Sequence, residues 1–288
     1  MAEYSHTPAV PPADEAEAEE QRALEERNRR LARAGVARAE ALLLTYYRLS
    51  SREESFELLR DTSQRFNLKL HTLAAAVVRL PVPAATAPRW VAGRPHGGPP
   101  PLPALDLNGT PQGQGEVLDA ALHRTLRITE TRMGNVQLVE NRLLRMVRHT
   151  GLNRQFTDYF TFVDSGTTSC AQAAEEARQV TVKDVNSCDT FDERSRQVIL
   201  RAGSRACHSV PLVSPRGAVV GMISTHHEQP LHELAPAQLA ALERVGGEVG
   251  RWLLWHHNTV VVDALNHLHV RATRRPRARP LPLPGTEE

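Results

Sequence analysis

A proline-rich stretch limits what this chain can fold into more than any other feature of its sequence. Between residues 81 and 115 regular structure is interrupted by Pro81, Pro83, Pro88, Pro95, Pro99, Pro100, Pro101, Pro103 and Pro111. Proline fixes φ and lacks a backbone N–H, so neither a helix nor a central strand fits here. The sequence therefore predicts a linker over residues 81–115 with a folded unit on each side. In polyproline geometry, at about 3.1 Å per residue, its ends could lie up to roughly 100 Å apart.

Length and composition fit two domains. Once the linker is subtracted, the 288 residues still leave each unit long enough to bury a core. Three cysteines at unrelated spacings favour a reducing compartment and argue against a disulfide framework. The sequence shows no N-terminal targeting signal and no apolar run approaching about 18 residues. We therefore expect a cytoplasmic protein with no membrane partner.

The first unit, residues 13–80, is predicted to be all-α, and residues 1–12 are expected to be disordered. Helix formers dominate up to Leu49, and an apolar seam at three–four spacing passes through Leu24, Asn28, Leu31, Ala32, Val36 and Ala39. A polar Asn28 on this seam is compatible with a two-stranded coiled coil in fixed register, which favours a homodimer. A single solvated helix with a thin apolar stripe is the alternative.

Three short helices are predicted after this leading helix. Their apolar faces are Ala39, Leu42, Leu43 and Tyr46; Phe56, Leu59, Ser63 and Phe66; and Leu70, Leu73, Ala74, Val77 and Val78. Ser51 with Glu54 is typical of a capping box, and Asn67 is predicted to cap the third helix. Each helix is too short to persist alone, so the three are expected to share one core. About forty residues bury little surface, which again favours a partner copy.

The strings Glu54–Arg60 (ESFELLR) and Ser63–Arg65, followed by Asn67, Lys69, Leu70 and Ala74, identify this module more specifically. It resembles the ANTAR domain, a three-helix RNA-binding antitermination module. The chain departs from the family at Glu40-Ala41, where a Lys-Gly pair is usual, and has Ser55 where alanine is preferred. The resemblance implies an RNA-binding surface, for which side chains suited to phosphate and base contact are Arg38, Arg60, Gln64, Arg65, Asn67 and Lys69. Asn67 could instead serve only as a cap.

The second unit, residues 116–257, shows an α+β pattern around an antiparallel sheet. Helices are predicted over 116–129 and 192–202, strand-like runs over 135–139, 144–148, 160–163 and 179–182, a hairpin with arms 206–213 and 218–225, and a long closing helix from Leu239 to Leu253. Residues 258–270 are expected to extend that helix. The basic, proline-containing tail over 271–288 is expected to be disordered.

Four features carry a second resemblance: Met133–Val139 (MGNVQLV), Cys170 after Thr168-Ser169, Ser209–Ser214 (SVPLVS) and Gly221–His226 (GMISTH). Together they resemble a GAF domain, a sensor module. The resemblance implies a small-molecule pocket on one face of the sheet, with Asp164, Cys170, His208, Ser209 and His226 as candidates to line it. A scaffold without a ligand is the alternative. The RNA-type module precedes the sensor here, so dimer geometry or occlusion must carry any signal.

No residue pattern in the chain predicts catalysis, a cofactor or a metal. The cysteines show no C-x-x-C spacing. Neighbouring histidines such as His226-His227 point in different directions on a strand or helix, so they form no bidentate pair. Ser169, His226 and Asp164 could be grouped as a triad, but no G-x-S-x-G motif surrounds the serine. We therefore expect a protein that is not an enzyme.

The sequence as a whole predicts a multidomain regulator: an N-terminal all-α, three-helix ANTAR-like module preceded by a helix, and a C-terminal α+β GAF-like sensor. The predicted function is transcription antitermination, with a hairpin in the nascent transcript as RNA partner and a homodimer as assembly. The alternative is an interaction or dimerisation regulator whose module no longer binds RNA. This alternative arises because Glu40 places an acid where the family usually has a lysine. A DNA-binding regulator is disfavoured because no helix-turn-helix with a basic recognition helix is apparent.

Overall fold

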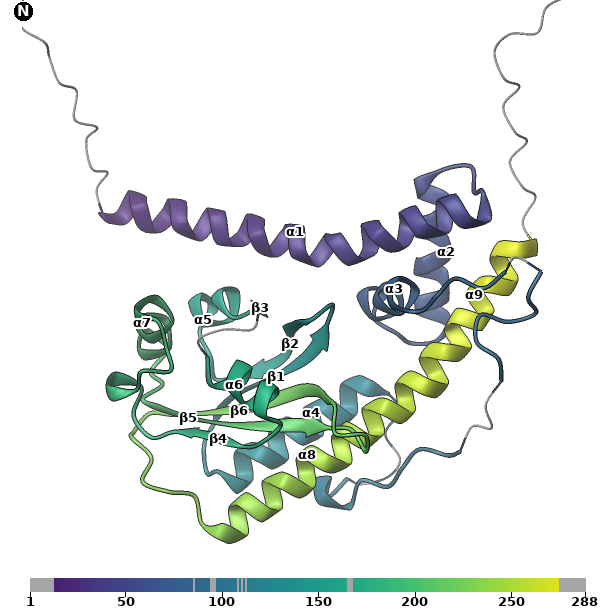
Figure 1. The fold of residues 1–288 in the computed structure, drawn as a ribbon. Coiled ribbons are helices and arrows are strands. Elements are labelled where there is room, and N and C mark those ends of the chain that lie inside the picture. The colour runs from purple at the N-terminus through teal and green to yellow at the C-terminus, as the bar shows by residue number, and fades with distance from the viewer. Residues whose placement is uncertain are drawn as a thin grey trace, which may run out of the picture.

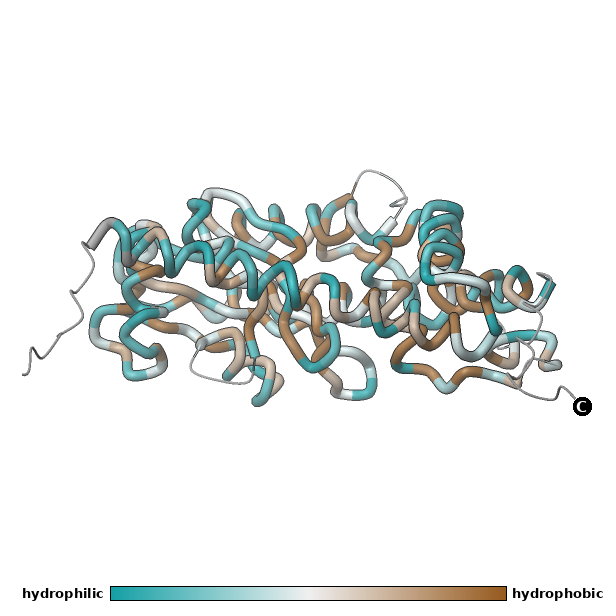
Figure 2. Tube along the Cα trace, turned by 90° about the horizontal axis from the view of Figure 1, so that it is seen from above, coloured by the Kyte–Doolittle hydropathy of each residue, from teal (hydrophilic) through white to brown (hydrophobic). Residues whose placement is uncertain are grey.

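A computed structural model of the protein describes residues 13–84, 86–93, 97–107, 109, 111, 113–164 and 168–274 (Figure 1). The segments expected to be disordered at 1–12 and from 275 onward lie outside the described residues. The chain forms a helical unit and a sheet unit side by side, and two long helices run from one to the other (Figure 1). Figure 2 shows the same elongated arrangement from above.

Helix α1 (Ala13–Tyr47) is a single 35-residue helix that contributes to both units. Its C-terminal part enters the helical core through Ala39, Leu43 and Tyr47, each at most 5% exposed. Leu42 and Tyr46 were predicted to face this core and instead remain 39% and 37% exposed. Apolar residues occupy both neighbouring helical faces here, so periodicity alone could not select the buried one.

Helices α2 (Arg52–Arg65) and α3 (Leu70–Arg79) complete the predicted three-helix set. Ser51 caps α2 as predicted, because its hydroxyl accepts from the Glu54 N–H at 3.2 Å. The prediction that Asn67 caps α3 is wrong: Asn67 has a φ of 49° in the preceding turn, and the cap position is Lys69. Phe56 was predicted to be buried but is 38% exposed.

The core of the helical unit is completed by the C-terminal helix of the same chain. Helix α9 (Val262–Arg274) inserts Ala264, Leu265, Leu268 and Ala272 among the buried residues of α1, α2 and α3. The small burial of the three helices was one reason to expect a partner copy. Because α9 supplies that missing surface, this reason no longer holds. The predicted disorder from residue 271 is also corrected, since α9 remains helical to Arg274.

The sheet unit contains a six-stranded antiparallel sheet in the order β3-β2-β1-β6-β5-β4. The strands are β1 (Met133–Glu140), β2 (Leu143–Thr150), β3 (Phe162–Val163), β4 (Val180–Val182), β5 (Ala206–Val213) and β6 (Val219–His227). Helices α4 (Gln114–Ile128) and α8 (Pro236–His256) pack on one face. The other face is covered by α5 (Arg154–Tyr159), α6 (Ser169–Glu176) and α7 (Glu193–Arg201), with a short 3-10 turn η2 (Val185–Ser187). The predicted α+β class with an antiparallel sheet is confirmed.

Helix α8 lies unusually close to β5. A Cβ added at Gly246 would overlap the Pro211 backbone, and one added at Gly250 would overlap the Val213 backbone. Glycine at both positions therefore allows the helix to approach the strand. This contact fixes α8 on the sheet, so the direction in which its C-terminal end leaves the sheet unit is fixed as well.

Helix α8 continues into the helical unit without a break in helical structure. A π-helical segment, η3 (His257–Val261), joins it to α9. The predicted helical extension is thus present, but its apolar residues belong to the core of the other unit.

The proline-rich segment packs along this helix and is not a free spacer. Trp90 is 5% exposed in the helical core, and the Val91 N–H donates to Asn266 Oδ1 at 3.0 Å. Further along, a short helix, η1 (Pro103–Leu105), buries its last residue, Leu105, in the core beside α4 and α8, so the prediction that no helix fits here is wrong at these residues. Proline is compatible with such a turn because it occupies the first helical position.

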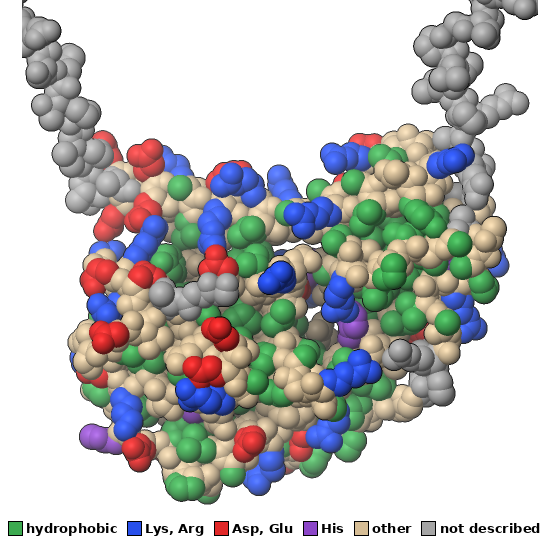
Figure 3. Space-filling view, in the orientation of Figure 1, with side chains coloured by type: hydrophobic (Ala, Val, Ile, Leu, Met, Phe, Trp, Pro, Cys, Tyr) green, Lys and Arg blue, Asp and Glu red, His purple; other side chains and the backbone are tan. Residues whose placement is uncertain are grey.

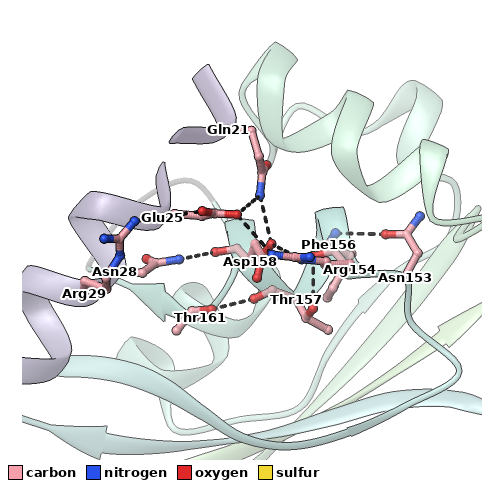
Figure 4. Close-up of polar contacts among 10 residues, drawn as sticks. All are labelled: Gln21, Glu25, Asn28, Arg29, Asn153, Arg154, Phe156, Thr157, Asp158 and Thr161. Carbon is pink, nitrogen blue, oxygen red and sulfur yellow. Dashed lines mark hydrogen bonds and ion pairs between the residues drawn. The ribbon is translucent and has the colours of Figure 1, made fainter. Parts of the chain in front are cut away.

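The N-terminal half of α1 lies on the sheet unit, against α5 and α7 (Figure 4). The Gln21 amide donates to Asp158 Oδ2 at 2.8 Å, and the Asn28 amide donates to the Asp158 carbonyl at 2.7 Å. Arg154 pairs with Glu25 at 3.1 Å. Asn28 was predicted to set the register of a coiled coil; in the structure it bonds within the chain instead.

Candidate nucleic-acid interface and sensor pocket

The predicted RNA-binding residues divide among three surfaces of the helical unit. Arg60, Gln64 and Arg65 are exposed on α2. Arg60 lies 3.3 Å from Asp61, which Arg271 of α9 also approaches at 3.8 Å. Arg65 lies close enough to His267 of α9 to lower the pKa of that histidine, after burial as the larger cause. The outer face of α2 thus carries basic and amide groups bordered by α9.

Asn67 and Lys69 face the sheet unit instead. They line a cavity of about 580 Å³ with the start of α4 and with Arg145 and Arg148 of β2. Arg148 pairs with Asp119 at 2.6 Å, and Arg145 pairs with Glu140 at 3.3 Å. The cavity therefore places a predicted RNA-binding lysine opposite two arginines of the other domain.

Arg38 lies apart from both groups. It is exposed on α1 and lines a third region, between α3 and the edge of the sheet. The six predicted side chains therefore do not form one continuous surface in this arrangement.

The region where the sensor pocket was predicted holds a small chamber, lined by both polar and apolar side chains, on the face of the sheet covered by α5 and α6. It encloses about 20 Å³, which is room for about one water-sized molecule. Of the five candidate residues, Cys170 and His226 line it. Ser209 borders it, with its hydroxyl 3.3 Å from that of Ser169 and 3.0 Å from that of Ser224.

His208 and Asp164 lie elsewhere. His208 points to the opposite face of the sheet, where its ring contacts Thr181 Oγ1 at 2.8 Å and Gln179 Oε1 at 2.9 Å. Consecutive strand residues point to opposite faces, so His208 and Ser209 could not both line one pocket. Asp164 is exposed and lines a separate cavity of about 510 Å³ beneath α1.

Two pocket residues that sequence reasoning missed lie on β1. Asn135 and Gln137 are buried polar side chains that line the chamber. The Gln137 amide donates to the Phe160 carbonyl at 3.2 Å, while its Oε1 has no hydrogen-bond partner among the described residues. The signal was present in the string GNVQLV, where polar and apolar residues alternate and both polar ones fall on the same face.

His226 is held neutral by the chamber. Its Nε2 donates to Asn135 Oδ1 at 3.1 Å, because that oxygen can only accept, and Nδ1 lies 3.0 Å from the Ser204 hydroxyl. Burial, and then the charge of His227, lower the pKa of His226 to about 3. Burial likewise raises the pKa of Cys207 to about 12, so this thiol is not a nucleophile at neutral pH.

Within the described residues, no group of three or more His, Cys, Asp or Glu side chains is arranged to hold a metal ion. In the same part of the chain no helix is long and apolar enough to cross a bilayer.

Comparison with known families assigns both units. The ANTAR domain model matches residues 19–78, and the GAF domain model matches residues 115–251. The chain is therefore built from two regulatory domains. The ANTAR domain is N-terminal and the GAF domain C-terminal. Neither match includes α9, although this helix completes the core of the ANTAR domain.

Several solved structures are similar in part, and no curated protein matches in sequence. The GAF domain/HD domain protein from Geobacter sulfurreducens has 18% identity and a TM-score of 0.41, covering 50% of this chain and 92% of that one. The GAF domain from Acinetobacter phosphoenolpyruvate-protein phosphotransferase has 14% identity and a TM-score of 0.40, covering 49% and 81%. The type II free methionine-R-sulfoxide reductase from Thermoplasma acidophilum has 14% identity and a TM-score of 0.39, covering 50% and 92%.

Proposed function

We propose that this protein is a non-enzymatic, cytoplasmic regulator that binds an RNA hairpin in a nascent transcript and so prevents a terminator from forming. The observation that carries the proposal is the outer face of α2. Arg60, Gln64 and Arg65 remain exposed there, while Leu58, Leu59 and Thr62 of the same helix are buried. Arginine and amide side chains on a rigid helix suit phosphate contact and the hydrogen-bonding edges of looped-out bases.

We further propose that the GAF domain regulates this activity by occlusion. Lys69 and Asn67 belong to the same ANTAR module but face the GAF domain across the 580 Å³ cavity. His71 of α3 is 2.8 Å from Glu140 of β1, which ties the two domains together at this edge. Both side chains are exposed, but an RNA hairpin is far larger than this cavity, so a hairpin that contacts Lys69 there needs the domains to separate. Occlusion also explains how a GAF domain that follows the ANTAR domain in sequence can control RNA binding by the ANTAR domain.

RNA binding is tested by recovering the full-length protein from cells, sequencing the bound RNA, and measuring affinity for the enriched hairpin. Arg65→Ala and Gln64→Ala should each weaken binding. For Arg65→Ala, the slope of log affinity against log salt should fall by about 0.7, the value for one lost single-stranded phosphate contact. Arg132→Ala, which removes an exposed arginine of the GAF domain, is the matched control and should change neither quantity.

A protein-interaction regulator remains the second candidate, because Leu42, Tyr46 and Phe56 expose apolar surface on α1 and α2. The same side chains offer a dimer surface, whereas the seam around Asn28 is occupied by the GAF domain. On this proposal light scattering shows a homodimer that Leu42→Glu converts to a monomer. If the wild type binds no hairpin at low salt, and Glu40→Lys does not restore binding, the interaction role replaces antitermination.

A ligand for the inner GAF chamber is not supported by its size. About 20 Å³ admits no metabolite unless α5 and α6 move away from the sheet. Thermal shift against a metabolite library tests this point: a stabilising ligand that loses its effect in His226→Gln would establish the chamber as the sensor site. The scaffold role predicts no such ligand.

A further inference from the structure

A mostly apolar cavity lies between the two domains. It has a volume of about 650 Å³ and is bounded by α3, the β1–β2 turn, the start of β6 and the junction of α8 with η3. Its apolar lining includes Leu138, Val139, Val220, Leu254 and Val261. Pockets of roughly 300–1,000 Å³ with mostly apolar walls, often at domain interfaces, are typical of small-molecule sites. Figure 3 shows the surface hollowed between the two halves, with basic and histidine side chains at the edge.

Arginines from three separate elements line the cavity: Arg38 of α1, Arg79 of α3 and Arg142 of the β1–β2 turn. None of the three has a carboxylate within ion-pair distance among the described residues. Glu140 is the one acidic side chain among the described lining residues, and its carboxylate is already shared by His71 at 2.8 Å and Arg145 at 3.3 Å. The cavity therefore has an excess of positive charge.

Two further observations support this electrostatic reading. Arg79 is exposed at the rim of the cavity, so its guanidinium can meet an anion that enters from solution. His257 also lines the cavity, and burial followed by the charge of Arg79 lowers the pKa of His257 to about 4. A cation that repels its neighbour and lacks a counter-ion is stabilised by any anion placed beside it.

We propose that this interdomain cavity binds a small amphipathic anion, with an apolar body against Val139 and Leu254 and a carboxylate or phosphate group at Arg79. The site is separate from the inner GAF chamber and does not depend on RNA binding. Because α3 belongs to the ANTAR domain and Val139 to the GAF domain, one ligand would touch both. Its occupancy would stabilise the closed arrangement of the two domains.

The test compares two probes of one shape, naphthalene-2-carboxylate and naphthalene-2-carboxamide, by calorimetric titration of the full-length protein. The carboxylate should bind at least about tenfold more tightly, since only it can pair with Arg79. Arg79→Gln should remove this preference and leave the carboxamide affinity unchanged. Arg244→Gln, an exposed arginine of α8 outside the cavity, should leave both affinities unchanged. Val139→Trp should weaken both probes by filling the cavity, and Val139 is 42% exposed, so the fold should tolerate the change.

Three results would overturn the proposal. Equal affinities for carboxylate and carboxamide would show that charge plays no part. Carboxylate binding that survives both Arg79→Gln and Val139→Trp would place the probe elsewhere on the protein. No binding of either probe at millimolar concentration would mean that the cavity is not a ligand site.

Discussion

The buried histidines make the stability of this protein sensitive to acid. The pKa of His226 is lowered to about 3, below the ordinary 6.5, and those of His208 and His256 are lowered to about 4, in each case chiefly by burial. Between the folded and unfolded pKa values, each of these histidines is protonated in the unfolded chain and neutral in the folded chain. The stability from these groups is therefore complete above pH 6.5 and is lost as pH falls toward 4 and then 3.

We predict that His226→Gln reduces this acid sensitivity. One group of this kind costs about 1.4 kcal/mol per pH unit below 6.5, so the loss of unfolding free energy between pH 7.5 and 5.5 should shrink by about 1 kcal/mol. At pH 7.5 the variant should be less stable by about 1–3 kcal/mol, because the bonds to Ser204 and Asn135 change. Urea unfolding at both pH values measures the two effects. An unchanged pH dependence would show that His226 is charged in the folded state.

The glycines of α8 provide a matched pair of predictions. Gly250→Ala should destabilise the protein by about 1–3 kcal/mol, because the new methyl group meets the Val213 backbone, which cannot move aside as a side chain can. Gly247→Ala has nothing within 4 Å and should stabilise by up to about 1 kcal/mol through helix propensity. Thermal unfolding of the two variants is the measurement. If both are tolerated equally, α8 does not lie as close to β5 as described.

At the scale of residues, the sequence predicted the kinds of side chain that line the GAF chamber, but it identified only some of the individual residues. The resemblance named Cys170 of α6 and His226 of β6, and both line the chamber. It could have excluded His208, since alternation with Ser209 is a property of the strand itself. The position of Asp164 beneath α1 could not be deduced, because it depends on where a helix from the other end of the chain docks.

At the scale of elements, α9 decides whether the ANTAR domain is stable. Leu265 and Leu268 are fully buried against residues of α1, α2 and α3. We predict that Leu268→Ala lowers the unfolding free energy by about 2–5 kcal/mol. Hydrogen exchange should rise in α2 and α3 before it rises in the sheet, because the lost contacts lie in the helical core. Arg274→Ala, at the exposed end of α9, should leave exchange in both domains unchanged.

The sequence predicted most of the helices and strands, but it did not predict which of them pack against one another. The apolar residues of α9 recur at helical spacing, but such a pattern does not say which surface it covers. The same limit explains α1, where the Leu42–Tyr46 and Leu43–Tyr47 pairs are equally apolar and only the position of α3 and α9 distinguishes them. For the proline-rich segment, local chemistry predicted no strand, and none lies among its described residues. It could not reveal that Trp90 and Leu105 hold the segment against the two cores.

At the scale of the whole molecule, ion pairs hold the N-terminal half of α1 against the GAF domain. Its N-terminal half places Glu17, Glu20 and Glu25 opposite Arg201, Arg194 and Arg154, at 3.4, 2.6 and 3.1 Å. Each of these exposed ion pairs contributes at most about 1 kcal/mol and is weakened by salt. The docking of this half of α1 is therefore held by several weak contacts and can be released without unfolding either domain.

We predict that raising salt from about 0.05 to 0.5 M increases hydrogen exchange in the N-terminal half of α1 while exchange in the sheet stays constant. Replacing Glu17, Glu20 and Glu25 together by lysine should produce the same opening at low salt, because each pair becomes a repulsion. Small-angle scattering should then report a larger radius of gyration. Salt-independent exchange in α1 would instead assign the docking to Gln21 and Asn28, whose hydrogen bonds are not screened.

The π-helical segment between α8 and α9 sets the rotation of α9 about its axis relative to the ANTAR core. Successive residues of an α-helix are rotated by about 100°, so the wider turn at His257–Val261 determines which side of α9 faces α2 and α3. If this turn were to tighten by one residue, Leu265 and Leu268 would swing about a quarter-turn away from the core while every contact of α8 with the sheet stayed in place. A shift of a few ångströms in η3, beside the GAF domain, would thus rotate α9. That rotation would withdraw its leucines from the ANTAR core and unfold the ANTAR domain.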